Sequence, residues 1–136
     1  MKQITVRLKD GQFLREEIER IARERNVRAG VILSLVGGVR NAHLRMPKLE
    51  TGEHIIKDLD GPFEIVSCTG TVSPDGCHIH LSISDRNGDC YGGHLKEGCA
   101  IFYTVELVIG IFEDAEYHRV MDANTGFEEL NVKSLK

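Results

Sequence analysis

Apolar and polar residues alternate along most of the chain, which is the pattern of half-buried β-strands. Residues 1–9 show this alternation, and in residues 100–111 every odd position from Ile101 to Ile109 is apolar. The same reasoning predicts further strands at residues 27–36, 39–46, 54–57, 63–72, 77–84 and 116–120. Gly37-Gly38 is expected to break the chain between two of them, and a turn at residues 124–126 is expected to lead into a polar tail.

One segment has a helical period instead. Residues 12–24 place Leu14, Ile18, Ile21 and Ala22 on one face, and arginines and glutamates alternate on the other, which predicts an ion-paired, solvated surface. Many strands joined by short turns, together with one clear helix, predict an α+β fold with a mostly antiparallel, twisted β-sheet. A length of 136 residues predicts a single domain over residues 1–136.

The most informative segment is residues 77–84. Ile79, Leu81 and Ile83 are apolar at every second position, so the opposite face of this strand carries His78 and His80. Imidazoles at positions i and i+2 of a strand project to the same side and lie close enough to share one metal ion. A third nitrogen can come from His94, because the sequence between returns the chain. Three neutral imidazoles with one open position form the ligand set of several catalytic zinc sites.

This interpretation depends on the register of the hairpin. A strict two-residue turn at Asn87-Gly88 would put His94 opposite Leu81, on the apolar face. A three-residue turn or one bulge would instead bring His94 opposite His80, and both Gly88 and Gly92-Gly93 permit such an irregularity. The alternative is that these histidines are solvated or hydrogen-bonded to neighbours, as are most histidines on the polar face of a strand.

Composition narrows the remaining choices. The net charge is −4, with 17 basic and 21 acidic residues, which argues against direct DNA binding. No apolar run approaches the about 18 residues of a membrane span, and the first residues lack a signal-peptide core, so we expect a cytoplasmic protein. Four cysteines without C-x-x-C spacing lie in apolar strand patterns and are expected to be buried, reduced thiols: Cys68, Cys77, Cys90 and Cys99.

Several segments resemble signatures of the PPC domain, the plants-and-prokaryotes conserved domain. They are GGVRNAHLR at 37–45, FEIVSCTG at 63–70, HIHLSISD at 78–85, GGHL at 92–95 and TVELVIG at 104–110. Residues 119–130 are similar to the usual ending of the domain. The resemblance covers nearly the whole chain in order and identifies it as a stand-alone member of this family.

The resemblance implies an antiparallel α+β fold and a homotrimer. In plants the domain follows an AT-hook, which enters the DNA minor groove, while the domain itself serves assembly and partner binding; the present sequence contains no AT-hook motif. The fold also resembles that of α-acetolactate decarboxylase, which holds zinc with three histidines, two of them in an H-x-H. His78, His80 and His94 match this pattern, and prokaryotic family members are known to contain metal, so the resemblance implies Zn²⁺.

Two functions follow as hypotheses. The first is a homotrimeric metal-binding module with a regulatory role, acting through a protein partner or a small-molecule ligand. The alternative is a small zinc-dependent lyase or hydrolase acting on a carbonyl or carboxylate substrate. In that case Glu106 is the candidate proton-transfer group and Arg45 the candidate carboxylate anchor. The simpler interpretation makes Glu106 a cross-strand ion pair or a support for the metal ligands, and Arg45 a surface salt bridge.

Overall fold

The computed structural model describes all residues, 1–136, and contains eight strands and one helix. No helix is long and apolar enough to cross a membrane. In chain order the elements are β1 (Lys2–Lys9), α1 (Leu14–Glu24), β2 (Gly30–Arg45), β3 (Ile56–Ser73), β4 (Gly76–Ser84), β5 (Cys90–Leu95), β6 (Ile101–Ile111), β7 (Ala115–Asp122) and β8 (Phe127–Ser134).

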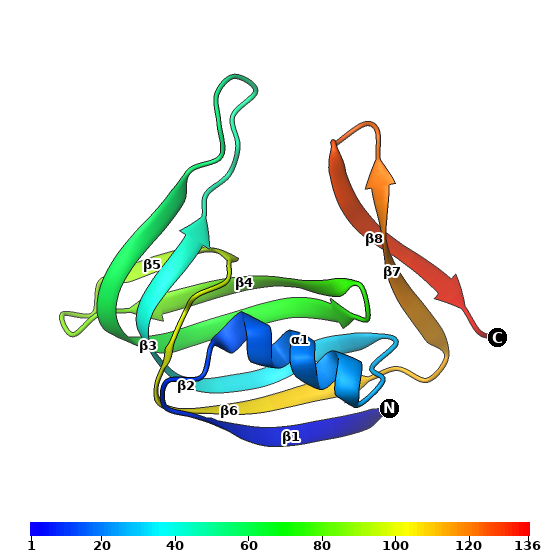
Figure 1. Cartoon of the computed structure of the whole chain (residues 1–136), viewed down its shortest axis with the longest axis horizontal. Coiled ribbons are helices and arrows are strands. Elements are labelled where there is room, and N and C mark those ends of the chain that lie inside the picture. Colours follow the sequence, from blue (N-terminus) through cyan, green and yellow to red (C-terminus); the bar gives the residue numbers. More distant parts are fainter.

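Six of the strands form one sheet in the order β1-β6-β2-β3-β4-β5, and every pairing is antiparallel. The far end of this sheet curls back, because β5 also pairs with the end of β2, where Leu44 faces Leu95 and Arg45 faces His94. Strands β7 and β8 form a separate hairpin that stands away from the sheet at the C-terminus (Figure 1). The predicted α+β fold with a mostly antiparallel sheet is therefore confirmed.

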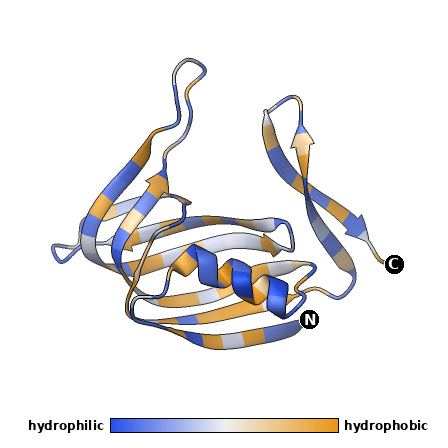
Figure 2. Cartoon of the chain, viewed as in Figure 1, coloured by the Kyte–Doolittle hydropathy of each residue, from blue (hydrophilic) through white to orange (hydrophobic).

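The hydrophobic core lies between the helix and the curled sheet. α1 crosses one face of the sheet (Figure 1), and its apolar residues alternate with polar ones along the helix (Figure 2). Leu14 and Ile18 are fully buried there. From β4 the core receives Ile79, Leu81 and Ile83, so the residues between them face away from it. Burying one such aliphatic side chain stabilises the fold by about 1.5–3 kcal/mol.

Two strands are longer than the sequence pattern predicts. Gly37-Gly38 does not break β2; a side-chain carbon at Gly37 would lie 2.1 Å from the carbonyl oxygen of Thr104, so these glycines allow close approach to β6 at a register shift. Likewise, the segments predicted at 54–57 and 63–72 belong to one strand, β3. A register shift in β2 between Val39 and Asn41 lets β3 continue past Gly61-Pro62.

The predictions for the two ends of the chain also need correction. The helix starts at Leu14, two residues later than predicted, because Phe13 is extended and bridges to Ala100, while the Gln12 carbonyl oxygen accepts the N–H of Ile101. The expected polar tail is a strand, β8, paired along its whole length with β7. All residues of β8 are exposed, so no single apolar face marks it in the sequence.

The prediction of buried, reduced thiols holds fully for two of the four cysteines, partly for a third, and is wrong for the fourth. All four are free. Cys77 and Cys99 are buried and Cys68 is half-buried, but Cys90 is exposed. Cys90 is the first residue of β5, next to the hairpin turn and outside the core, which is why it is exposed.

Candidate metal centre

The turn between β4 and β5 decides which face of the sheet His94 lies on, and the candidate site depends on this. Ser84 pairs with Cys90, the Gly88 N–H donates to the carbonyl oxygen of Asp85 at 3.0 Å, and Gly88 has φ of 84°. This is the three-residue turn rather than the two-residue one, and it needs the left-handed conformation that glycine adopts freely. β5 then runs without a register shift, and His94 lies opposite His80.

The Asp85 side chain supports this turn. Its Oδ1 atom accepts the backbone N–H groups of Asn87 at 2.8 Å and of Asp89 at 3.0 Å. Such side-chain-to-backbone bonds are the usual way in which aspartate stabilises turns. The turn is therefore fixed by two residues, Asp85 and Gly88, and through it the position of His94 relative to His80.

The three predicted histidines converge outside the core. Nitrogen atoms of His78, His80 and His94 all lie within 4.8 Å of one another, and the Nε2 atoms of His78 and His80 are 3.2 Å apart. Zinc–nitrogen bonds of about 2.0–2.1 Å at tetrahedral angles place ligand nitrogens about 3.3–3.4 Å apart. His78 and His80 already lie close to this spacing, and a ring nitrogen of His94 lies within 4.8 Å of both. The donor set fits a zinc ion.

The surroundings of two of these rings favour the neutral form that a metal requires. Burial lowers the pKa of His94 to about 3, and the charges of Arg45, His78, Arg15 and Lys96 act in the same direction. Partial desolvation also lowers the pKa of His78, assisted by His80 and nearby arginines, although Glu129 opposes this. At neutral pH both rings therefore carry a free lone pair, and a metal would not have to displace a proton from them.

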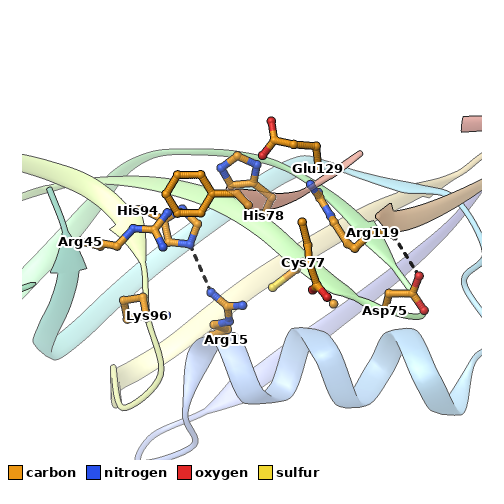
Figure 3. Close-up of a pocket in the computed structure, with 12 residues that line it drawn as sticks. Arg15, Arg45, Asp75, Cys77, His78, His94, Lys96, Arg119 and Glu129 are labelled. Atoms are coloured by element: carbon orange, nitrogen blue, oxygen red, sulfur yellow. Dashed lines mark hydrogen bonds between the residues drawn. The ribbon is translucent and has the colours of Figure 1, made fainter. Parts of the chain in front are cut away.

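His94 has an unusual pair of neighbours. Arg15 Nη1 lies 3.5 Å from His94 Nε2, and Arg45 Nη2 lies 3.4 Å from His94 Nδ1, so guanidinium groups face both ring nitrogens (Figure 3). A neutral imidazole has one acceptor nitrogen and one N–H donor, whereas guanidinium has donors only. One of the two contacts therefore brings two donors together, and the N–H of His94 has no protein acceptor among these neighbours.

A cavity of about 290 Å³ adjoins the cluster on the side of His78 and His94. Residues from α1, β2, β7 and β8 complete its wall (Figure 3). Its charged lining comprises the cations Arg15, Arg45, Lys96 and Arg119 and the carboxylates Asp75, Glu128 and Glu129. The histidine cluster thus borders an open, predominantly charged recess and is not enclosed by further protein ligands.

The structure places the other candidate residues differently. Arg45 lines the cavity beside His94, as an anchor for a carboxylate would, and its guanidinium stacks over the Phe127 ring at 5.5 Å. Glu106 is exposed on β6, where it pairs in register with Arg7 of β1 and Val36 of β2, and it is not among the residues that line the cavity. The fold therefore brings Arg45 to the triad but does not bring Glu106 there within one chain.

Sequence reasoning missed Arg15, Lys96 and Arg119 as neighbours of the site. Arg15 was predicted to belong to a solvated helix face; it does form an ion pair with Glu19 at 2.9 Å, but its side chain is only 14% exposed. Lys96 follows two residues after His94, and this closeness in the sequence could have indicated that it lies near the site. No local pattern points to Arg119, because β7 reaches the cavity only through the tertiary fold.

Solved structures with the same fold cover almost the whole chain. A protein from Salmonella enterica aligns with a TM-score of 0.89 and 32% identity, covering 98% of this chain and 94% of that chain. A protein of Archaeoglobus fulgidus described as metal-containing aligns with a TM-score of 0.84 and 31% identity, covering 96% and 94%.

Two more distant structures share the fold alone. A Staphylococcus aureus protein described as similar to α-acetolactate decarboxylase aligns with a TM-score of 0.54 and 20% identity, covering 81% of this chain and 52% of that chain. The expected relation of the fold to that of the decarboxylase is thus confirmed. A protein of Bacteroides thetaiotaomicron, provisionally described as DNA-binding, reaches a TM-score of 0.86 at 17% identity, covering 95% and 91%.

The chain is 38% identical over 133 residues to the bifunctional protein GlmU of a Synechococcus species, covering 98% of this chain but only 20% of that protein. It therefore spans about one fifth of the length of this relative. Residues 1–113 match the Plants and Prokaryotes Conserved (PCC) domain, the family called PPC above. On these grounds, the chain belongs to the Plants and Prokaryotes Conserved domain family.

Proposed function

We propose that this protein binds zinc through His78, His80 and His94. The observation that carries the proposal is the convergence of three imidazole nitrogens within 4.8 Å on the polar side of the β4–β5 hairpin. The description of the Archaeoglobus fulgidus protein as metal-containing supports it. Three neutral imidazoles suit zinc, since imidazole is one of its preferred ligand types.

The test is metal analysis of protein purified without a histidine tag. We expect one zinc ion per chain after dialysis against metal-free buffer. A purified protein that contains no transition metal, and that takes up none when zinc is supplied at equimolar concentration, would contradict the proposal.

The metal-bearing domain is proposed to act as a homotrimeric module with a regulatory or partner-binding role. Exposed apolar side chains on neighbouring strands β2, β3 and β6 support an assembly, because a contiguous apolar patch on a surface commonly marks an interaction site. Val36 and Val66 flank the paired residues Gly37 and Ile65 and are 57% and 58% exposed, while Tyr103 is 74% exposed. β1 is also an unpaired edge of the sheet.

We expect light scattering at micromolar concentration to give three times the chain mass of 15.2 kDa. Assembly would bury the exposed side chains of Val36 and Val66. Identical chains most often assemble with closed symmetry, and a three-membered ring is one such arrangement. Val66→Asp should shift the mass towards the monomer, whereas Val120→Asp on the separate hairpin is the matched control. A monomer mass for the unmodified protein would refute the trimer.

We expect no DNA affinity of physiological use. A protein that neutralises several phosphates needs clustered basic residues, but here 17 basic residues stand against 21 acidic ones and assembly would multiply the negative charge. Titration against a labelled duplex at about 150 mM salt decides the matter, because non-specific binders have dissociation constants near 10⁻⁴–10⁻⁶ M there. Submicromolar binding that weakens steeply with salt would contradict this expectation.

A second candidate function is a zinc-dependent lyase or hydrolase acting on a carbonyl or carboxylate substrate. The observation that favours it is the cavity, which borders His78 and His94 and leaves room for a ligand at the metal. A catalytic zinc polarises a carbonyl group or lowers the pKa of its bound water. X-ray absorption of the zinc protein would show three nitrogens and an exchangeable oxygen, whereas a fourth protein ligand would exclude catalysis.

A further inference from the structure

Two arginines of the cavity lack a carboxylate partner. Every ion pair between an arginine and a carboxylate in the structure involves Arg15, Arg20, Arg28 or Arg40. Arg45 and Arg119 form none, although both line the cavity beside the triad. Most half-buried guanidinium groups are paired, because desolvating a charge without a partner is unfavourable. The two arginines are therefore suited to a negative group that is not part of the protein.

Both guanidinium groups are held in position from other elements. Arg119 of β7 donates from Nη2 to the Thr71 hydroxyl oxygen of β3 at 2.8 Å. The Arg45 guanidinium stacks over the Phe127 ring of β8 at 5.5 Å. A guanidinium held in this way binds a planar or tetrahedral oxyanion through a fork of N–H donors, with little further loss of side-chain entropy.

The carboxylates in the same cavity do not take this role. Asp75 accepts the backbone N–H of Arg119 at 3.0 Å and lies 3.4 Å from Nδ1 of His118, so it is engaged away from the guanidinium. Glu128 and Glu129 line the cavity from β8 but are exposed, and neither forms an ion pair with Arg45 or Arg119. The donors of Arg45 and Arg119 remain available despite three acidic neighbours.

The His94 ring supplies an independent argument. The neutral ring carries a proton on one nitrogen, and on either nitrogen that proton faces a guanidinium at 3.4 or 3.5 Å. An anion oxygen that bridges the ring N–H and the guanidinium would accept from both, which removes the conflict between the two donors.

We propose that the cavity binds a small molecule through its oxyanion group, a carboxylate or a phosphate, held by Arg45 and Arg119 next to the metal. A volume of about 290 Å³ suits a small metabolite rather than a polymer. The location beside a metal rests on the proposed function. The anion site itself does not, because its two guanidinium groups are present without metal.

The test is therefore made on metal-free protein, at constant ionic strength, by calorimetric titration with malonate and, separately, with inorganic phosphate. We expect saturable binding of at least one of them with a dissociation constant of about 1 mM or tighter. Preference for malonate indicates a carboxylate ligand, and preference for phosphate a phosphorylated one. Because no metal is present, the result is independent of whether the histidine triad binds zinc.

Variants locate the site. Arg45→Gln and Arg119→Gln are each expected to weaken binding about tenfold or more, since each removes charge-assisted hydrogen bonds. Arg45→Lys keeps the charge but loses the forked N–H donors, so its affinity for the anion should lie between those of the unmodified protein and of Arg45→Gln. Circular dichroism checks that each variant folds. Arg23→Gln, an exposed arginine of α1 outside the cavity, is the matched control. Absence of saturable binding, or equal weakening in the Arg23 variant, would overturn the proposal.

Discussion

Replacing His80 by alanine is expected to abolish stoichiometric zinc binding while leaving the fold intact. His80 is exposed and faces away from the core, so its removal opens no cavity. Two imidazoles that remain cannot supply the three protein ligands of such a site, and the affinity falls accordingly. Elemental analysis after dialysis should find one zinc per chain in the unmodified protein and essentially none in His80→Ala.

Thermal unfolding provides a second measurement of the same change. A ligand that binds only the folded state at 1,000 times its dissociation constant adds about 4.1 kcal/mol to the free energy of unfolding. Added zinc should therefore raise the melting temperature of the unmodified protein but not that of His80→Ala. His118→Ala is the matched control, because His118 is a partly exposed strand histidine outside the triad. Stoichiometric zinc in His80→Ala would show that His80 is not a ligand.

Local pattern was sufficient to predict the two faces of β4. The alternation of Ile79, Leu81 and Ile83 assigned His78 and His80 to the polar side, and the structure buries the first three and exposes the other two. The sequence also left only two positions for His94: opposite His80 on the polar face, or opposite Leu81 on the apolar face. The sequence allowed either a three-residue turn or a bulge at Gly92-Gly93, and choosing between them required the hydrogen bonds of the turn itself.

Long-range pairing explains what local pattern could not predict. Arg45 and His94 are neighbours because β5 closes back onto the end of β2, a contact between residues 49 positions apart. Whether a sheet curls far enough to close in this way depends on its accumulated twist and bulges, and on no single segment. The same holds for Arg119: alternation predicted a strand at residues 116–120, but no local pattern indicated that this strand reaches the cavity.

The second large effect is expected at Gly70, on the strand next to the site. Gly70 of β3 pairs with Ile79 of β4, and a side-chain carbon there would lie 2.4 Å from the carbonyl oxygen of His78 and 2.9 Å from the Cα of Ile79. Both are backbone atoms, so the histidine-bearing strand itself must move. In Gly70→Ala this overpacking costs about 1–3 kcal/mol, which exceeds the about 0.5–1 kcal/mol gained by replacing a strand glycine with alanine.

Displacement of β4 should also reach the metal, since His78 and His80 are both carried by it. We expect Gly70→Ala to melt at a lower temperature and to bind zinc about 10–100-fold more weakly, the range typical of changes that disturb the support of metal ligands. Gly92→Ala on β5 is the matched control, because its added carbon would lie 3.3 Å from the nearest atom, the Leu81 carbonyl oxygen, and needs a shift of only a few tenths of an ångström. Chemical denaturation and competition with a zinc chelator measure the two effects separately. Zinc affinity equal to that of the unmodified protein in a destabilised Gly70→Ala would mean that the triad does not depend on the exact placement of this strand.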